Sequence, residues 1–320
     1  MLSRWIRFIF WSPFETACRK TPIIPLKFSI ETVTPSVELI RIDNILTRAI
    51  SKLGGSYDYS VSYLIDKTLL IDTGFPWARK SMKKHFMLSG LCSTIKYTVN
   101  THSHEDHIGN NDLIKEITSS KIYIHKSGIN TAKFPRHLPW YRNFMFGPPP
   151  SSNAEPIPDK INFNGFEFLV LHLPGHSPDH ICLFEPNKKW LFSGDLYISA
   201  DLDSQLREVD GPAWILSLER AIALKPLWMF DSHGIVFSGE QEVFQALNNK
   251  LQFLNNLRNK VFEVGQTATS VNEIVAKVFS KKNVVNQLSF SDGWLSLLTS
   301  SDFSRTHLVQ SFLNNTNPDS

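Results

Sequence analysis

The stretch THSHEDHIGN, residues 101–110, decides how the rest of this 320-residue sequence is interpreted. It brings three histidines and two acids together between His102 and His107. Imidazole and carboxylate groups are the side chains that bind zinc and related ions in proteins. The stretch is therefore either a solvated, charged surface turn or part of a metal site, and its neighbours along the chain decide between the two.

The residues on either side of this stretch predict a strand that runs into a helix. IKYTVNT, residues 95–101, has a strand pattern, and a helical pattern starts near residue 109. His102 and His104 are two residues apart on the extended end of the strand, so both point to the same side. Asp106 and His107 lie where the chain turns and can face a second metal. One segment can thus supply ligands to two ions.

Further ligand types follow other strand-like runs. His176 comes after a Pro-Gly turn, Asp195 ends the run LFSGD, and His233 follows the apolar run 227–230. Because each of these side chains comes at the end of an apolar run, all of them can converge on one rim of a sheet.

Strand and helix patterns alternate through the first two thirds of the chain. Strand patterns occupy residues 36–43, 59–66, 67–74, 95–101, 121–125, 167–175, 180–186 and 189–195. Helical patterns occupy residues 77–90, 109–119 and 212–224. This alternation predicts a layered α/β domain. Proline and glycine are frequent in residues 134–158, which predicts a loop or lid.

Composition and charge narrow the classes of partner. The net charge of +3 is mild and does not by itself suggest a polyanionic partner. The three cysteines, Cys18, Cys92 and Cys182, are far apart and form no CxxC pair, which favours a reduced, cytoplasmic compartment without a disulfide framework.

Taken in order, the motifs resemble those of the metallo-β-lactamase superfamily. His-x-His-x-Asp-His follows a strand, and Gly-His, Gly-Asp and Ser-His-Gly come after it; LLIDTG, with Asp72, matches the first motif of that superfamily. The resemblance implies an αββα sandwich, in which two mixed β-sheets lie face to face with helices outside.

The resemblance also implies roles for individual residues. Metal 1 would be held by His102, His104 and His176, metal 2 by Asp106, His107 and His233, and Asp195 would bridge them. Asp106 would in addition orient the nucleophile, as a catalytic residue. Asp72 would support the ligands, although a turn residue capping Gly74 is an equal alternative. Two zinc ions per chain fit this His-rich set, and iron or manganese is compatible with the same ligand types.

The implied domain organisation has three parts. Residues 1–34 form a leader, which can be loose; its basic, aromatic start allows weak contact with a membrane surface but is too short to span a bilayer. Residues 35–238 form the metal hydrolase domain. Residues 239–320 form a small helical module that shapes the pocket or a homodimer contact, in which Ser270 caps a helix with Glu273 at its third position.

Three classes of function are compatible with these motifs. The first is hydrolysis of a small ester or thioester by a metal-bridged hydroxide, as in glyoxalase II; lactones belong to the same class. The second is cleavage of RNA, since the helical module is similar to the tail of the β-lactamase-like endoribonucleases. That tail, residues 241–320, carries seven Lys/Arg and six Asp/Glu, which makes a nucleic acid a less favoured partner. The third, a non-catalytic binder, would be expected to lose ligands, and none is missing.

Some further residues have two interpretations each. Glu105 is expected to point away from the metals, solvated or supporting a ligand, and His180 is expected to brace the ligand loop. Tyr197 either packs or donates to a substrate, and Arg207 is either solvated or reaches an anionic substrate group. The aromatic stretch 139–150 is either the rim of an acyl pocket or a plug between domains.

Overall fold

The computed structural model describes residues 26–44, 59–280, 299 and 301–314. Most of the expected leader, residues 1–25, lies outside this range, and so does Cys18. The remainder of the leader is not loose. Residues Leu26–Thr34 form β1, which pairs antiparallel with β2 (Val37–Asn44), and Leu26 and Phe28 pack against a buried cluster. The expected boundary at residue 34 therefore cuts through a hairpin.

The first sheet has seven strands in the order β1-β2-β3-β4-β5-β6-β7. The other five strands are β3 (Tyr59–Ile65), β4 (Leu69–Ile71), β5 (Tyr97–Val99), β6 (Lys121–Ile124) and β7 (Glu155–Pro156). Pairing is antiparallel from β1 to β4 and parallel from β4 to β7. The predicted tight connection of β3 to β4 is present: Asp66 and Lys67 both have positive φ, as a type I′ turn requires.

The second sheet has six strands in the order β13-β12-β11-β10-β9-β8. They are β8 (Lys160–Phe163), β9 (Phe166–His172), β10 (Ile181–Glu185), β11 (Trp190–Gly194), β12 (Trp228–Asp231) and β13 (Val236–Ser238). Only the β11–β12 pairing is parallel among those described. Both sheets place buried residues between them, among them Tyr63, Phe168, Phe192 and Phe230, and these form the central core.

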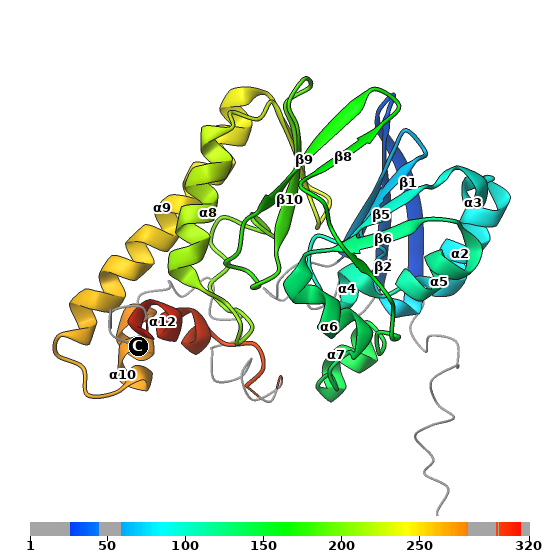
Figure 1. Cartoon of the computed structure of the whole chain (residues 1–320). Helices are drawn as coiled ribbons and strands as arrows, with labels where there is room; N and C mark the ends of the chain where they lie inside the picture. Colours follow the sequence, from blue (N-terminus) through cyan, green and yellow to red (C-terminus); the bar gives the residue numbers. More distant parts are fainter. Residues whose placement is uncertain (1–25, 45–58, 281–298, 300, 315–320) are drawn as a thin grey trace, which may run out of the picture.

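Helices cover the outer face of each sheet, which gives the αββα layering expected from the sequence (Figure 1). The first sheet is covered by η2 (Pro76–Ala78), α2 (Arg79–Leu88), α3 (Leu91–Thr94) and α5 (Asn111–Ile117), the second by α8 (Gly211–Ala223) and α9 (Glu240–Gly265). The shorter α4 (Glu105–Ile108), η3 (Lys126–Gly128), α6 (Ile129–Lys133) and α7 (Trp140–Met145) lie at one end of the sandwich. The expected loop over residues 134–158 thus contains a short helix and the edge strand β7.

The C-terminal part is helical where it is described, as predicted. After α9 it contains α10 (Val271–Val278) and α12 (Arg305–Asn314). Ser270 caps α10 by accepting from the N–H of Glu273, whose own carboxylate accepts from Thr269. Buried residues of α9, α10 and α12 join one apolar cluster with α8, so the C-terminal helices and the second sheet share a core. Among the described helices, none is both long and apolar enough to cross a membrane.

Candidate metal centre

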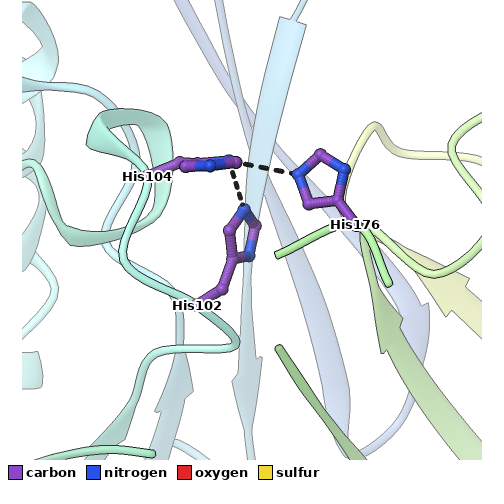
Figure 2. Close-up of side chains that lie close together, drawn as sticks. All are labelled: His102, His104 and His176. Atoms are coloured by element: carbon purple, nitrogen blue, oxygen red, sulfur yellow. Dashed lines mark hydrogen bonds between the residues drawn. The ribbon is translucent and has the colours of Figure 1, made fainter. Parts of the chain in front are cut away.

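Two loops at one end of the sandwich bring three histidine rings together. His102 and His104 lie between β5 and α4, and His176 lies in the loop that follows β9 (Figure 2). Nδ1 of His104 is 2.8 Å from Nε2 of His102 and 3.1 Å from Nε2 of His176. These three ring nitrogens converge on one point, and the side chains of His102 and His176 are buried.

A second group forms beside the first. Nε2 of His107 lies 3.5 Å from Oδ2 of Asp106 and 3.5 Å from Oδ1 of Asp195. The carboxylate of Asp195 connects the two groups, because its Oδ2 is 3.3 Å from Nε2 of His176 and 3.4 Å from Nε2 of His233. The structure therefore brings together all seven residues that the motifs singled out.

The unpaired atoms in this cluster fit a bound cation. Nε2 of His107 and Oδ1 of Asp195 are buried and have no hydrogen-bond partner in the part of the chain that the structure describes, although buried polar atoms are normally paired. Three sets of ligand atoms each lie within 4.8 Å of one another: His102, His104 and His176; His102, His107 and Asp195; and Asp106, His107 and His233. Imidazole and carboxylate groups at this spacing could hold divalent ions such as zinc.

The electrostatics of the cluster are those of a cation site. Burial and the neighbouring histidines lower the pKa of His102 and of His176 well below the usual range, so both rings are neutral, as metal ligands must be. Burial acts to raise the pKa of Asp195, but His107 and His233 outweigh it and hold that pKa well below its usual value. The opposite balance raises the pKa of His107, since Asp106 and Asp72 outweigh its burial, so these acids favour positive charge at this ring.

Asp72 supports the ligand-bearing turn, as expected from the first motif. Its carboxylate accepts hydrogen bonds from the backbone N–H and the hydroxyl of Thr101, at 2.8 and 2.9 Å, and lies 2.9 Å from Nδ1 of His107. A proton on Nδ1 of His107 leaves Nε2 free to face Asp106 and Asp195. Asp72 itself has a φ of 58°, a strained backbone conformation for a residue other than glycine. Its three side-chain contacts hold it in that conformation.

His180 braces the loop that carries Asp195, in agreement with the sequence-based expectation. Its Nδ1–H donates to the carbonyl of Leu173, and its Nε2 accepts from the backbone N–H of Asp195 at 2.9 Å. Burial lowers the pKa of His180 to about 4, so the ring stays neutral in this role. A Cβ on Gly194, whose φ is 52°, would lie only 2.6 Å from Nε2 of His180.

Glu208 contacts the cluster directly, and sequence reasoning missed it. Its Oε1 is 2.5 Å from Nε2 of His104, and this pairing holds the pKa of Glu208 at about 2 against the effect of burial. No spacing rule marks Glu208, and not its neighbour Arg207, as the residue that contacts the cluster. Arg207 is exposed, as expected for a solvated arginine. Asp231 was also missed, although it stands two residues before His233; its carboxylate accepts from the N–H of His233.

The structure excludes a solvated role for Glu105 and decides between the two expected roles of Tyr197. Glu105 is not solvated: it is 3 % exposed and binds the guanidinium of Arg142 through both carboxylate oxygens. Glu105 has this partner because α7 folds over the ligand turn. Tyr197 packs in the core, the first of its two expected roles, with its ring edge-on to Phe237.

A cavity of about 150 Å³ opens beside His104. Its lining includes the apolar Ile108, Leu138 and Pro149 and the charged Arg136, Arg142, Asp179 and Glu208. The stretch 139–150 thus contributes to a pocket wall. Its Trp140 and Phe144 are 65 % and 44 % exposed, so these two rings do not plug an interdomain gap.

Comparison with known proteins identifies the family. The model of the metallo-beta-lactamase superfamily matches residues 56–233, more than half of the chain, and the chain belongs to that superfamily. The superfamily is hydrolytic, and this chain carries the groups that could hold its divalent metals.

Three relatives show the range of similar proteins. The lactamase-like protein notP of an Aspergillus species is 25 % identical over 80 % of this chain and 76 % of its own length. The hydroxyacylglutathione hydrolase of Legionella pneumophila is 32 % identical over 33 % of this chain and 35 % of its own. The atrochrysone carboxyl ACP thioesterase of Claviceps purpurea is 23 % identical over 76 % of each.

A solved structure supports the fold. A beta-lactamase domain protein from Burkholderia ambifaria superposes with a TM-score of 0.61 at 19 % identity and covers 90 % of this chain and 88 % of its own. At this level of identity the likeness concerns the fold alone.

Proposed function

We propose that this protein is a binuclear zinc hydrolase that cleaves a small ester or thioester. One ion would be held by His102, His104 and His176, the other by Asp106, His107 and His233, and Asp195 would lie between them. The observation that carries the proposal is the position of the Asp195 carboxylate, within 3.5 Å of ring nitrogens of both groups.

The chain's own residues prepare this site for hydrolysis. Two divalent ions bound there would supply hydroxide at neutral pH and polarise the oxygen of the scissile carbonyl. Asp106 is buried, and its pKa is lowered because His107 outweighs the effect of burial, so its carboxylate is available as an acceptor for the attacking water. Because His102 and His176 are neutral, each ring has a nitrogen available to bind a metal ion. The cavity beside His104 admits a substrate.

The charge of the cavity favours an acyl substrate over a phosphodiester. Arg142 is already paired with Glu105 and Asp302, and the other arginine among the cavity's described lining residues, the exposed Arg136, lies 3.5 Å from Glu208. Proteins that grip several phosphates need several clustered cations. The apolar wall at Ile108 and Leu138 suits an acyl group instead. Relatives named as a hydroxyacylglutathione hydrolase and a thioesterase support the same choice.

A substrate panel tests the choice of bond. Protein with matched zinc content would be assayed on acyl thioesters, simple esters, lactones, bis-p-nitrophenyl phosphate and single-stranded RNA, with the Asp106→Ala variant as the control for contaminating enzymes. We expect a higher kcat/KM for an ester or thioester than for either phosphodiester, and loss of that activity in the variant. RNA cleavage that exceeds every acyl substrate and disappears in Asp106→Ala would replace the proposal with the endoribonuclease alternative.

A further inference from the structure

One guanidinium joins three separate segments at the edge of the cavity. Arg142 lies on α7, and its side chain is only 12 % exposed. Its Nε donates to Oε1 of Glu105 at 2.6 Å, its Nη2 donates to Oε2 of the same carboxylate, and its Nη1 donates to Oδ2 of Asp302 at 3.3 Å. The hydroxyl of Tyr141 donates to the same oxygen of Asp302 at 2.7 Å.

The position of Glu105 gives this ion network its importance. Glu105 stands between His104 and Asp106, and its backbone belongs to the turn that carries four of the candidate ligands. With a side chain that is 2 % exposed, it has little access to water, so the guanidinium supplies the charge and the hydrogen bonds that water would otherwise provide. Bidentate pairing also fixes the direction of the carboxylate, because the planar fork matches its geometry.

We propose that Arg142 is a positioning residue, which holds the metal-ligand turn through Glu105 and ties that turn to the C-terminal segment through Asp302. Removal of the guanidinium leaves the Glu105 carboxylate buried and unpaired one residue from two ligands. The turn then loses its fixed geometry, and the ligand atoms no longer converge. The C-terminal segment thereby acts on the metal centre without supplying a ligand. This inference rests on the proposed binuclear site.

Metal affinity, measured without any substrate, tests the inference. Zn²⁺ would be titrated into metal-free full-length protein in competition with a chromogenic chelator. We expect Arg142→Met to weaken Zn²⁺ binding about 10- to 100-fold, the usual range for residues that orient ligands. Arg142→Lys keeps the charge but loses the bidentate fork, so it should recover part of the affinity. Asp302→Asn, which leaves the Glu105 pair intact, should weaken binding by less than about tenfold.

Arg79 provides the matched control. It also binds two acids, Asp112 and Glu116, but its side chain is 40 % exposed and its partners lie outside the ligand turn. Arg79→Met should leave Zn²⁺ affinity unchanged. An Arg142→Met protein that melts at a lower temperature without metal yet binds Zn²⁺ as tightly as the wild type would show a purely structural role and overturn the inference.

Coupling between the pair gives a second, independent readout. If Arg142 acts through Glu105, the Glu105→Gln/Arg142→Met double variant should lose less affinity than the sum of the two single losses, since the unpaired carboxylate is gone. Additive losses would contradict the inference. A wild-type protein that binds no Zn²⁺ at all would instead refute the proposed function, so the two failures are distinguishable.

Discussion

The Nε2 atom of His104 lies 2.5 Å from Oε1 of Glu208, and the other nitrogen of the same ring faces His102 and His176. A histidine that binds a metal through one nitrogen commonly donates its other N–H to a carboxylate or carbonyl, which fixes the ring and raises its basicity. Glu208 lies in the segment between β11 and α8, so this segment sets the orientation of a ligand on the opposite sheet.

Replacement of Glu208 by alanine should therefore lower metal affinity by about 10- to 100-fold without abolishing folding. Glu208→Gln retains an acceptor oxygen and should lose less. Chelator competition with Zn²⁺ measures both, and Glu219→Ala, at an exposed acid of α8, serves as the control. Unchanged affinity in Glu208→Ala would mean that the contact does not orient His104.

Gly175, the residue before His176, should not tolerate a side chain. Its φ is 144°, and a Cβ would lie 2.4 Å from Cα of Trp214. We expect Gly175→Ala to lower the free energy of unfolding by about 2–4 kcal/mol, since both strain and a backbone clash oppose it. Gly90→Ala is the matched control: φ is also positive, but the Cβ meets nothing within 4 Å, and a loss of about 1 kcal/mol is expected. Equal losses in urea denaturation would contradict the clash.

Lys250 on α9 should make stability depend on pH. Its side chain is fully buried, its Nζ lies 4.7 Å from the centre of the Trp214 ring, and it has no hydrogen-bond partner among the described residues. Burial lowers its pKa to about 7, although Asp201 and Asp203 act in the opposite direction. Between this pKa and the usual value of 10.5, the unfolded chain holds a proton that the folded chain has released, so the contribution of Lys250 to stability improves as pH rises.

Lys250→Met should consequently be more stable than the wild type at pH 6, by about 3–5 kcal/mol, with the difference shrinking toward pH 10. Lys80→Met, at an exposed lysine of α2, should show no such trend. Denaturant titrations at a series of pH values give the comparison. A difference that stays constant with pH would mean that Lys250 is not buried as an unpaired amine.

The fold and the seven clustered residues could be predicted because their signals are local. Each candidate ligand stands at the end of an apolar run, and strand ends meet at one rim of the sandwich. The position of β1 could not be predicted in the same way, because the sequence alone places Leu26–Thr34 in a leader and only the pairing with β2 reveals a strand. The ligand residues around His102, in contrast, can be recognised from the sequence alone.

The supporting contacts were missed because they join residues far apart in the chain. Glu208 lies 104 residues from His104, and Arg142 lies 37 residues from Glu105. An isolated glutamate is most often solvated, and the correct partner is visible only after α7 and the segment before α8 have folded over the ligand turn. The ligand set can thus be predicted from the sequence, whereas the residues that orient it can be identified only from the tertiary packing.

The metal content of the purified protein is the most direct test of the binuclear site. Elemental analysis after exhaustive dialysis should find close to two divalent ions per wild-type chain, with zinc as the main metal. It should find markedly less metal in Asp195→Ala, which lacks the carboxylate that would contact both ions. A folded wild-type protein that retains no divalent metal, or an Asp195→Ala variant that retains as much as the wild type, would contradict the binuclear site.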